Sequence, residues 1–89
     1  MDLQFERVYQ AKVESVRQHY EDAFRNVEYE VFFSSGKKMY FRRNKKQVMC
    51  IVPGNTIRFT AKNDGLGNWH IDQVLESWNP EVKIVVHHQ

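Results

Sequence analysis

The sequence lacks the features that mark several large classes of protein. A single cysteine, Cys50, excludes a disulfide framework within the chain. No apolar run approaches the roughly 20 residues of a membrane-spanning helix, and the longest, Val48–Val52, has the length of a strand. The first ten residues include acids and no apolar run, so we expect no signal peptide, no membrane partner and a cytoplasmic location.

Acidic residues are missing from the middle of the chain. Between Val31 and Asn63 there are eight lysines and arginines and no aspartate or glutamate, so this window carries +8. The remaining residues hold the other five basic side chains and all 11 acidic ones, a balance of −6 that the net charge of +2 conceals. Such polarisation is typical of proteins that bind a polyanion, although the solvated face of a hairpin can also be basic.

Glycine and proline are absent before Gly36 and occur at intervals along the chain from there on. The turn-forming groups are SSG at 34–36, PGN at 53–55, NDGLGN at 63–68 and NP at 79–80. Between them, apolar residues alternate with polar ones, as in strands with one buried face. The alternating apolar positions are Val27, Tyr29, Val31, Phe33, Met39, Phe41, Ile57, Phe59, Ala61, Trp69 and Ile71. Short strands separated by turns predict an all-β, antiparallel meander.

The first 26 residues fit two different structures. An apolar residue recurs every three or four positions over residues 5–24, which is the spacing of a helix that Asp2 would cap. Over the same stretch Tyr9, Ala11 and Val13 alternate with polar residues, as in a strand. The strand-like character of the rest of the chain favours a strand, and an N-terminal helix packed on the sheet (an α+β fold) is the alternative.

Four segments of strand-like sequence follow one another along the chain. They are AKVESV (11–16), the hairpin YEVFF/KKMYFRR (29–43), VPGNTIRFTAK (52–62) and WHIDQV (69–74). Their order resembles the oligonucleotide/oligosaccharide-binding (OB) fold of the nucleic-acid-binding superfamily. The resemblance covers about residues 9–77 and implies a single domain, 1–89, built as a small five-stranded antiparallel barrel with a C-terminal extension at 78–89. Segment 44–55 has room for at most one short turn where many OB folds carry a helix.

The resemblance also implies where a ligand binds. In OB folds the ligand lies on the face of strands 2 and 3, between the loops that join strands 1–2 and 4–5. Because side chains alternate along a strand, the residues on either side of Met39 and Phe41 would point outward there. The predicted binding residues are Phe32, Lys37, Lys38, Tyr40, Arg42, Arg43, Lys45, Lys46, Arg58, Lys62 and Trp69. For Trp69 a place in the core is the alternative, as it is for Phe32 if a β-bulge turns that side chain inward.

A surface that combines aromatic and basic side chains suits single-stranded DNA or RNA. Exposed bases stack on the aromatic rings while the cations track the phosphates, with little dependence on sequence. The four histidines and Cys50 lack the spacing of metal ligands, and no nucleophile accompanies His70 and Asp72. We therefore expect a nucleic-acid-binding protein without a metal, a cofactor or enzymatic activity.

The acid-rich remainder of the chain supports a second hypothesis. The protein would then be a small protein-interaction module, such as a phage- or plasmid-type regulator or inhibitor of a nucleic-acid enzyme. Its partner would be a protein of the nucleic-acid machinery. A third hypothesis is self-association through the β-prone segment VKIVV at 82–86.

Overall fold

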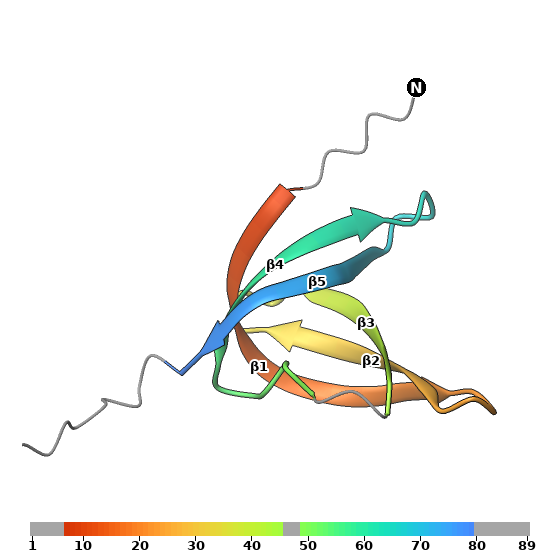
Figure 1. Ribbon diagram of the computed structural model, residues 1–89. Helices are drawn as coiled ribbons and strands as arrows, with labels where there is room; N and C mark the ends of the chain where they lie inside the picture. Colours follow the sequence, from red (N-terminus) through yellow and green to blue (C-terminus); the bar gives the residue numbers. More distant parts are fainter. Residues whose placement is uncertain (1–6, 46–48, 80–89) are drawn as a thin grey trace, which may run out of the picture.

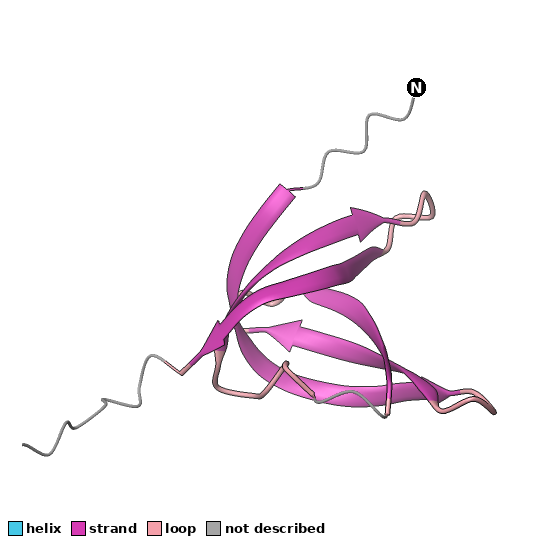
Figure 2. Ribbon diagram, viewed as in Figure 1, coloured by secondary structure: helices cyan, strands magenta, loops and turns pink. Residues whose placement is uncertain are grey.

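The computed structural model describes residues 7–45 and 49–79, and these residues are all β (Figures 1 and 2). The strands are β1 (Arg7–Glu21), β2 (Asn26–Phe33), β3 (Lys38–Asn44), β4 (Thr56–Asn63) and β5 (Trp69–Trp78). The described residues contain no helix, so the all-β prediction is confirmed and the helical alternative is wrong over residues 7–21. In this part of the chain, accordingly, no helix is long and apolar enough to cross a membrane. The predicted helix cap at Asp2, the binding residue Lys46 and the segment 80–89 lie outside the described residues.

The five strands form one sheet that closes on itself. Strand β1 is long enough to pair with two neighbours. Its first half, from Arg7 to Lys12, lies antiparallel to β4, and its second half, from Val13 to Glu21, lies antiparallel to β2. The resulting order, β1-β2-β3-β5-β4, is that of a closed barrel, around which β1 curves strongly (Figure 1).

The predicted meander and the purely antiparallel sheet are both wrong. Strands β3 and β5 run parallel, with Tyr40 opposite His70 and Phe41 opposite Ile71. Strand β4 does not follow β3 through a tight turn, because Ile51, which lies between them in the sequence, is buried in the core. Strand β4 therefore pairs with β1, and β5, which follows β4 through a short loop, lies between β4 and β3.

Irregularities in β1 explain why its sequence has the spacing of a helix. Where β1 pairs with β2, the register shifts between Val13 and Ser15 and again between Gln18 and Tyr20. Each shift inserts an extra residue, so the inward-facing side chains change parity along the strand. Val13 and Val16, three positions apart, consequently both pack against the core. A β-bulge thus produces the step of three residues that also indicates a helix.

Alternate residues from all five strands fill the inside of the barrel. Phe33 of β2 and Phe59 of β4 stack across it, with ring centroids 5.5 Å apart and ring planes 3° from parallel. Every alternating apolar position predicted from the sequence is buried, except Trp69. Cys50 is half-buried and packs against this core. The predicted alternation is therefore confirmed over β2 to β5.

Two hairpins extend beyond the barrel, and both project to the right in Figure 1. The β1–β2 loop is held by Asp22, whose Oδ1 accepts the backbone N–H groups of Phe24 at 2.8 Å and Asn26 at 3.0 Å. The chain turns back at Arg25, whose φ of 67° lies in the left-handed region. That region suits glycine and is costly for a residue with a Cβ atom.

Replacing Arg25 with glycine is expected to raise the free energy of unfolding by about 0.5–1 kcal/mol, because the left-handed strain is relieved while glycine adds disorder to the unfolded chain. Urea unfolding measures the change. Gly36→Ala is the matched control: φ is +90° there and no atom lies within 4 Å of an added Cβ, so a loss of about 1 kcal/mol is expected from backbone conformation alone. A destabilised Arg25→Gly variant would contradict this account of the turn.

Candidate functional site

One outward-facing side chain from each strand contributes to a row across the outside of the barrel. The strand registers place Arg17 opposite Glu30, Glu30 opposite Tyr40, Tyr40 opposite His70, and His70 opposite Lys62. We call these five residues the outer row. The row exists because β5 pairs with β3 in the closed barrel. This pairing places His70 of β5, and with it Lys62 of β4, next to Tyr40 of the β2–β3 hairpin.

Tyr40 occupies the middle of the outer row and is half-buried. Its ring lies between two imidazoles, with centroids 5.9 Å from that of His19 and 5.5 Å from that of His70. The Nζ of Lys38 lies 5.0 Å from the centre of the same ring, a distance at which a cation is attracted to an aromatic face. A hydrogen bond with the Tyr40 side chain, followed by one with Glu30, raises the pKa of Lys38. The ring is thus flanked by groups that are cationic or can become so.

Glu30 is the most deeply buried member of the outer row, with 4% of its surface exposed. Its Oε1 accepts hydrogen bonds from Nη2 and Nε of Arg17 at 2.6 and 3.1 Å, and its Oε2 lies 3.2 Å from Nζ of Lys38. His19 Nδ1 lies 3.4 Å from the same Oε1. The hydrogen bonds from Arg17 are the main reason that the pKa of Glu30 is lowered. One carboxylate therefore neutralises part of the positive charge on this face.

A second aromatic side chain lies beside the outer row. Phe32 points outward and is half-buried, opposite Lys38 on β3 and Ser15 on β1. The guanidinium carbon of Arg17 lies 5.9 Å from the centre of its ring. Phe33, the next residue, is buried in the core, so the two phenylalanines alternate as the strand pattern predicts. The alternative of a bulge that buries both is wrong.

The structure separates the other predicted cations into distinct places. Arg42 is exposed next to the outer row, opposite Glu28 on β2. Lys62 belongs to the row and forms an ion pair of 3.4 Å with Asp72. Arg58 also points outward, but it lies four residues from Lys62 toward the other end of β4, beside Gln10 and 3.7 Å from Glu76. Arg58 is therefore not part of the surface around Tyr40.

The predicted turn cations do not form one surface either. Arg43 is part of β3 and not of the turn beyond it, and its guanidinium carbon lies 5.4 Å from the centre of the Tyr29 ring, where Nη2 donates a hydrogen bond of 3.1 Å to the Tyr29 hydroxyl. It shares the inward parity of Met39 and Phe41 and is half-buried, which explains this contact. Lys45 forms an ion pair of 2.7 Å with Glu21, and this pairing lowers the pKa of Glu21.

The remaining predicted residues lie toward the β2–β3 turn and the start of β5. Lys37 is exposed in the turn between β2 and β3. Trp69 has the inward parity of Ile71, but 39% of its surface is exposed, and its ring meets that of Tyr9 edge-on at 6.2 Å. Trp69 therefore lies at the end of the barrel and not on its outer face.

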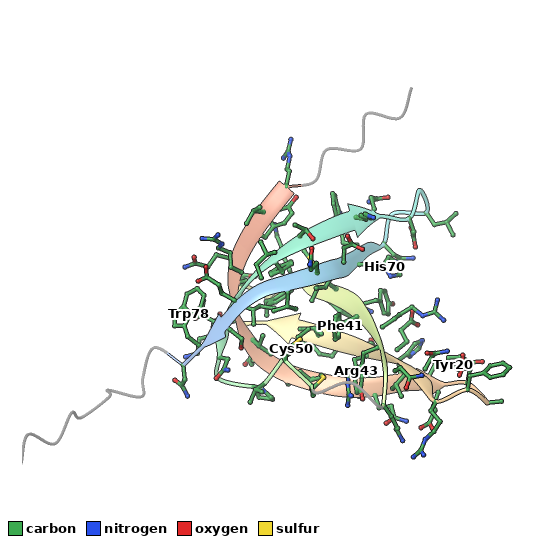
Figure 3. The ribbon with its side chains drawn as sticks, viewed as in Figure 1. Tyr20, Phe41, Arg43, Cys50, His70 and Trp78 are labelled. Carbon is green, nitrogen blue, oxygen red and sulfur yellow. The ribbon has the colours of Figure 1, made fainter. Side chains whose placement is uncertain are left out.

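Figure 3 shows His70 and Tyr20 on the side toward which the hairpins project, with Trp78 at the far end of β5.

The β4–β5 loop positions His70. Within this loop Asp64 Oδ1 accepts the backbone N–H groups of Leu66 at 2.7 Å and Asn68 at 3.2 Å, while Oδ2 lies 3.1 Å from Nε2 of His70. These interactions, the one with His70 foremost, lower the pKa of Asp64 to about 2. The same carboxylate thus holds the loop and orients the imidazole beside Tyr40.

Acid should remove the stabilising effect of Asp64. Because its folded-state pKa is lowered, the carboxylate stabilises the fold above pH about 4, and this contribution is lost as the pH falls toward 2. Asp64→Asn is therefore expected to be less stable than the original protein at pH 6 and to approach it near pH 2. Urea unfolding over this pH range tests the expectation, with Asp72→Asn as the control carboxylate. A stability difference that is constant with pH would contradict it.

Sequence reasoning missed three residues of this surface, namely Arg17, His19 and His70. The alternation around Ile71 is enough to point His70 outward, but its place beside Tyr40 depends on the parallel pairing of β3 with β5. The positions of Arg17 and His19 depend on the register shifts in β1. Both depend on tertiary pairing, for which the sequence carries no local signal.

No protein-family model matches the chain, and neither the curated proteins nor the solved structures include one with significant similarity to it. The function is therefore inferred from the site.

Proposed function

We propose that the protein binds single-stranded DNA or RNA, with little sequence specificity, on the outer face formed by β1, β2, β3 and β5. The observation that carries the proposal is the partly exposed ring of Tyr40, placed between His19 and His70 and under Lys38. Phe32 supplies a second ring in the neighbouring row. Aromatic rings stack on bases of any identity, and adjacent cations neutralise phosphates.

The partly exposed Tyr40 ring favours a single-stranded ligand over a duplex. A duplex hides the flat faces of its bases, so an exposed tyrosine ring would contribute little to binding it, whereas a single strand offers each base for stacking. The β1–β2 and β4–β5 hairpins project on the same side in Figure 1. Their tips carry the most exposed large apolar side chains described, Phe24 (80% exposed) and Leu66 (84%).

We also propose that the barrel belongs to the OB class. A five-stranded Greek-key barrel that binds its ligand on strands 2 and 3, between the 1–2 and 4–5 loops, is the arrangement of that class. The strand order β1-β2-β3-β5-β4 and the absence of a helix from described residues 49–55 are compatible with a helix-less member.

A titration with fluorescent oligo-dT, oligo-U and the corresponding duplexes at two salt concentrations tests the proposal. Single strands are expected to bind and duplexes to bind more weakly. The logarithm of the affinity should fall with the logarithm of the salt concentration by about 0.7 per neutralised phosphate. The absence of any anisotropy change with single strands at low salt would overturn the proposal.

Neutralising Glu30 is expected to strengthen binding. In Glu30→Gln, Arg17 and Lys38 no longer pair with a carboxylate, so both become available to phosphates. We expect the affinity for oligo-dT at low salt to rise about two- to fivefold, because Arg17 and Lys38 are themselves solvent-exposed and a new pair with a phosphate contributes about as much as a surface ion pair. Glu76→Gln is the matched control, because it removes the same charge beside Arg58 and away from the outer row. Equal gains in the two variants, or weaker binding by Glu30→Gln, would contradict the assignment.

A protein partner is the second candidate function. The exposed Phe24 and Leu66 and the neutralisation of Arg17 and Lys38 by Glu30 favour it, because apolar tips and balanced charge suit a protein surface. Co-purification of a partner that survives nuclease treatment would support this function, whereas loss of all partners with nuclease would support nucleic-acid binding.

A further inference from the structure

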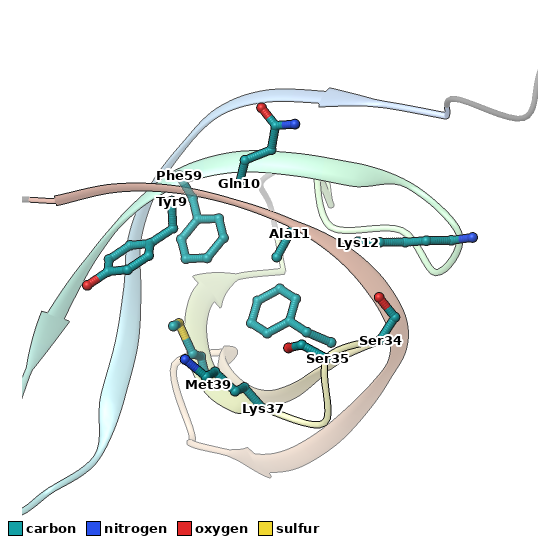
Figure 4. A pocket seen from close by; sticks show the side chains of 10 residues that line it. Tyr9, Gln10, Ala11, Lys12, Ser34, Ser35, Lys37, Met39 and Phe59 are labelled. Carbon is teal, nitrogen blue, oxygen red and sulfur yellow. The ribbon is translucent and has the colours of Figure 1, made fainter.

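A cavity opens at one end of the barrel, away from the outer row. It has a volume of about 270 Å³ and lies between the first half of β1, the β2–β3 turn and β4. Figure 4 shows it with Tyr9 and Phe59 on one side and with Met39, Lys37 and Ser35 on the other. Small-molecule sites usually range from about 300 to 1,000 Å³, so this cavity has the size for one small ring system.

The walls of the cavity are mainly apolar, and three of the residues that line it are aromatic: Tyr9, Phe33 and Phe59. Phe59 stacks on Phe33 with centroids 5.5 Å apart and on Tyr9 with centroids 5.8 Å apart. The Met39 side chain adds a polarisable thioether, which makes favourable contacts with aromatic rings. A second cavity of about 300 Å³ shares Tyr9 and Met39 with the first and extends to Trp69. A flat apolar group would therefore meet mainly apolar side chains in these cavities.

The rim of the two cavities is positively charged. Lys37 lines both cavities, Lys38 lines the second, and Ser34 and Ser35 line the first. Among the residues that the structure describes, no aspartate or glutamate lines either cavity. In Figure 4 the Lys37 side chain extends toward Met39, whereas Lys12 points away from the cavity. The rim thus complements an anionic group attached to the ring.

We propose that this end of the barrel binds a small planar aromatic anion, that is, one or two fused rings bearing a carboxylate or phosphate. The apolar walls hold the ring system, and Lys37 with the serine hydroxyls holds the anionic group. The proposal does not depend on nucleic-acid binding, because the cavity lies inside the end of the barrel and Tyr40 does not line it.

Methionine methyl resonances provide a direct test with 2-naphthoate as the probe. The ring current of a bound naphthalene should shift the ¹³C-methyl signal of Met39 in a saturable manner. Met49 packs against the core and does not line either cavity, so its signal is the internal control. The absence of a saturable Met39 shift, or an equal shift of Met49, would overturn the proposal.

Two variants and a neutral analogue test the assignment of the walls and the rim. Lys37→Gln should weaken 2-naphthoate about two- to fivefold, as expected for one exposed ion pair, and leave 2-naphthalenemethanol unaffected. Ala11→Leu should fill the cavity and abolish binding of both. Should Ala11→Leu fail to fold, Lys37→Gln decides, because its side chain is exposed. Equal weakening of the anion and the alcohol would overturn the charge assignment. Tyr40→Ala should bind 2-naphthoate with unchanged affinity. This variant therefore distinguishes a failure of this proposal from a failure of the proposed function.

Discussion

Replacing Tyr40 with alanine is expected to weaken oligo-dT binding by about one to two orders of magnitude. Stacking of a base on an aromatic side chain contributes about 1–3 kcal/mol, and Tyr40 is the ring at the centre of the proposed face. The dependence of affinity on salt should stay unchanged, because no charge is removed. Fluorescence anisotropy at several salt concentrations measures both quantities.

Three control variants separate stacking from charge. Tyr40→Phe keeps the ring and should retain most of the affinity. Arg42→Ala should lower the salt dependence, because Arg42 is exposed beside the outer row, whereas Arg58→Ala removes the same side chain at the other end of β4 and should have little effect. Equal losses in Arg42→Ala and Arg58→Ala, or unchanged binding by Tyr40→Ala, would contradict the proposed face.

Replacing Phe59 with alanine is expected to lower the free energy of unfolding by about 3–5 kcal/mol. Phe59 is 1% exposed and stacks on Tyr9 of β1 and Phe33 of β2, so its ring fills space between elements that are distant in sequence. A loss of this size is much of the stability of a small domain. Urea unfolding followed by circular dichroism measures it.

A double-mutant cycle tests the contact across the barrel more closely. The variants Phe33→Leu, Phe59→Leu and their combination should show a coupling of about 0.5–1.5 kcal/mol, the contribution of an aromatic pair beyond its burial. Phe24→Ala, at the exposed tip of the β1–β2 hairpin, should leave stability nearly unchanged. Strictly additive losses at Phe33 and Phe59 would contradict the stacking across a closed barrel.

The sequence predicts the strands and their inward faces because these follow from alternation along each strand. Met39 and Phe41 are buried, and their neighbour Tyr40 points outward, as the pleat requires. The turns at Gly36 and Gly54 are also readable, since both residues have positive φ. The features that depend on a single strand, namely its extent and its inward face, were therefore predictable from the sequence.

The order of the strands was not predictable from local sequence. Nothing near Ile51 in the sequence shows that residues 49–51 pack against the core in place of a tight turn, and no local pattern shows the parallel contact of β3 with β5. The same limit applies to the site. Arg43 is a charged residue of the kind expected at the surface, yet it lies on the inward-facing side of β3 and contacts the Tyr29 ring. Glu30 lies outside the acid-free window of the sequence but pairs with Lys38 within it.

The most direct test of nucleic-acid binding on the outer face is a map of amide chemical-shift changes on titrating ¹⁵N-labelled protein with oligo-dT at low salt. We expect saturable changes that cluster at Phe32, Lys38, Tyr40 and His70 and at the two projecting hairpins, with little change around Arg58 at the other end of β4. Changes concentrated around Arg58 and Glu76, or none at any oligonucleotide concentration, would contradict the account.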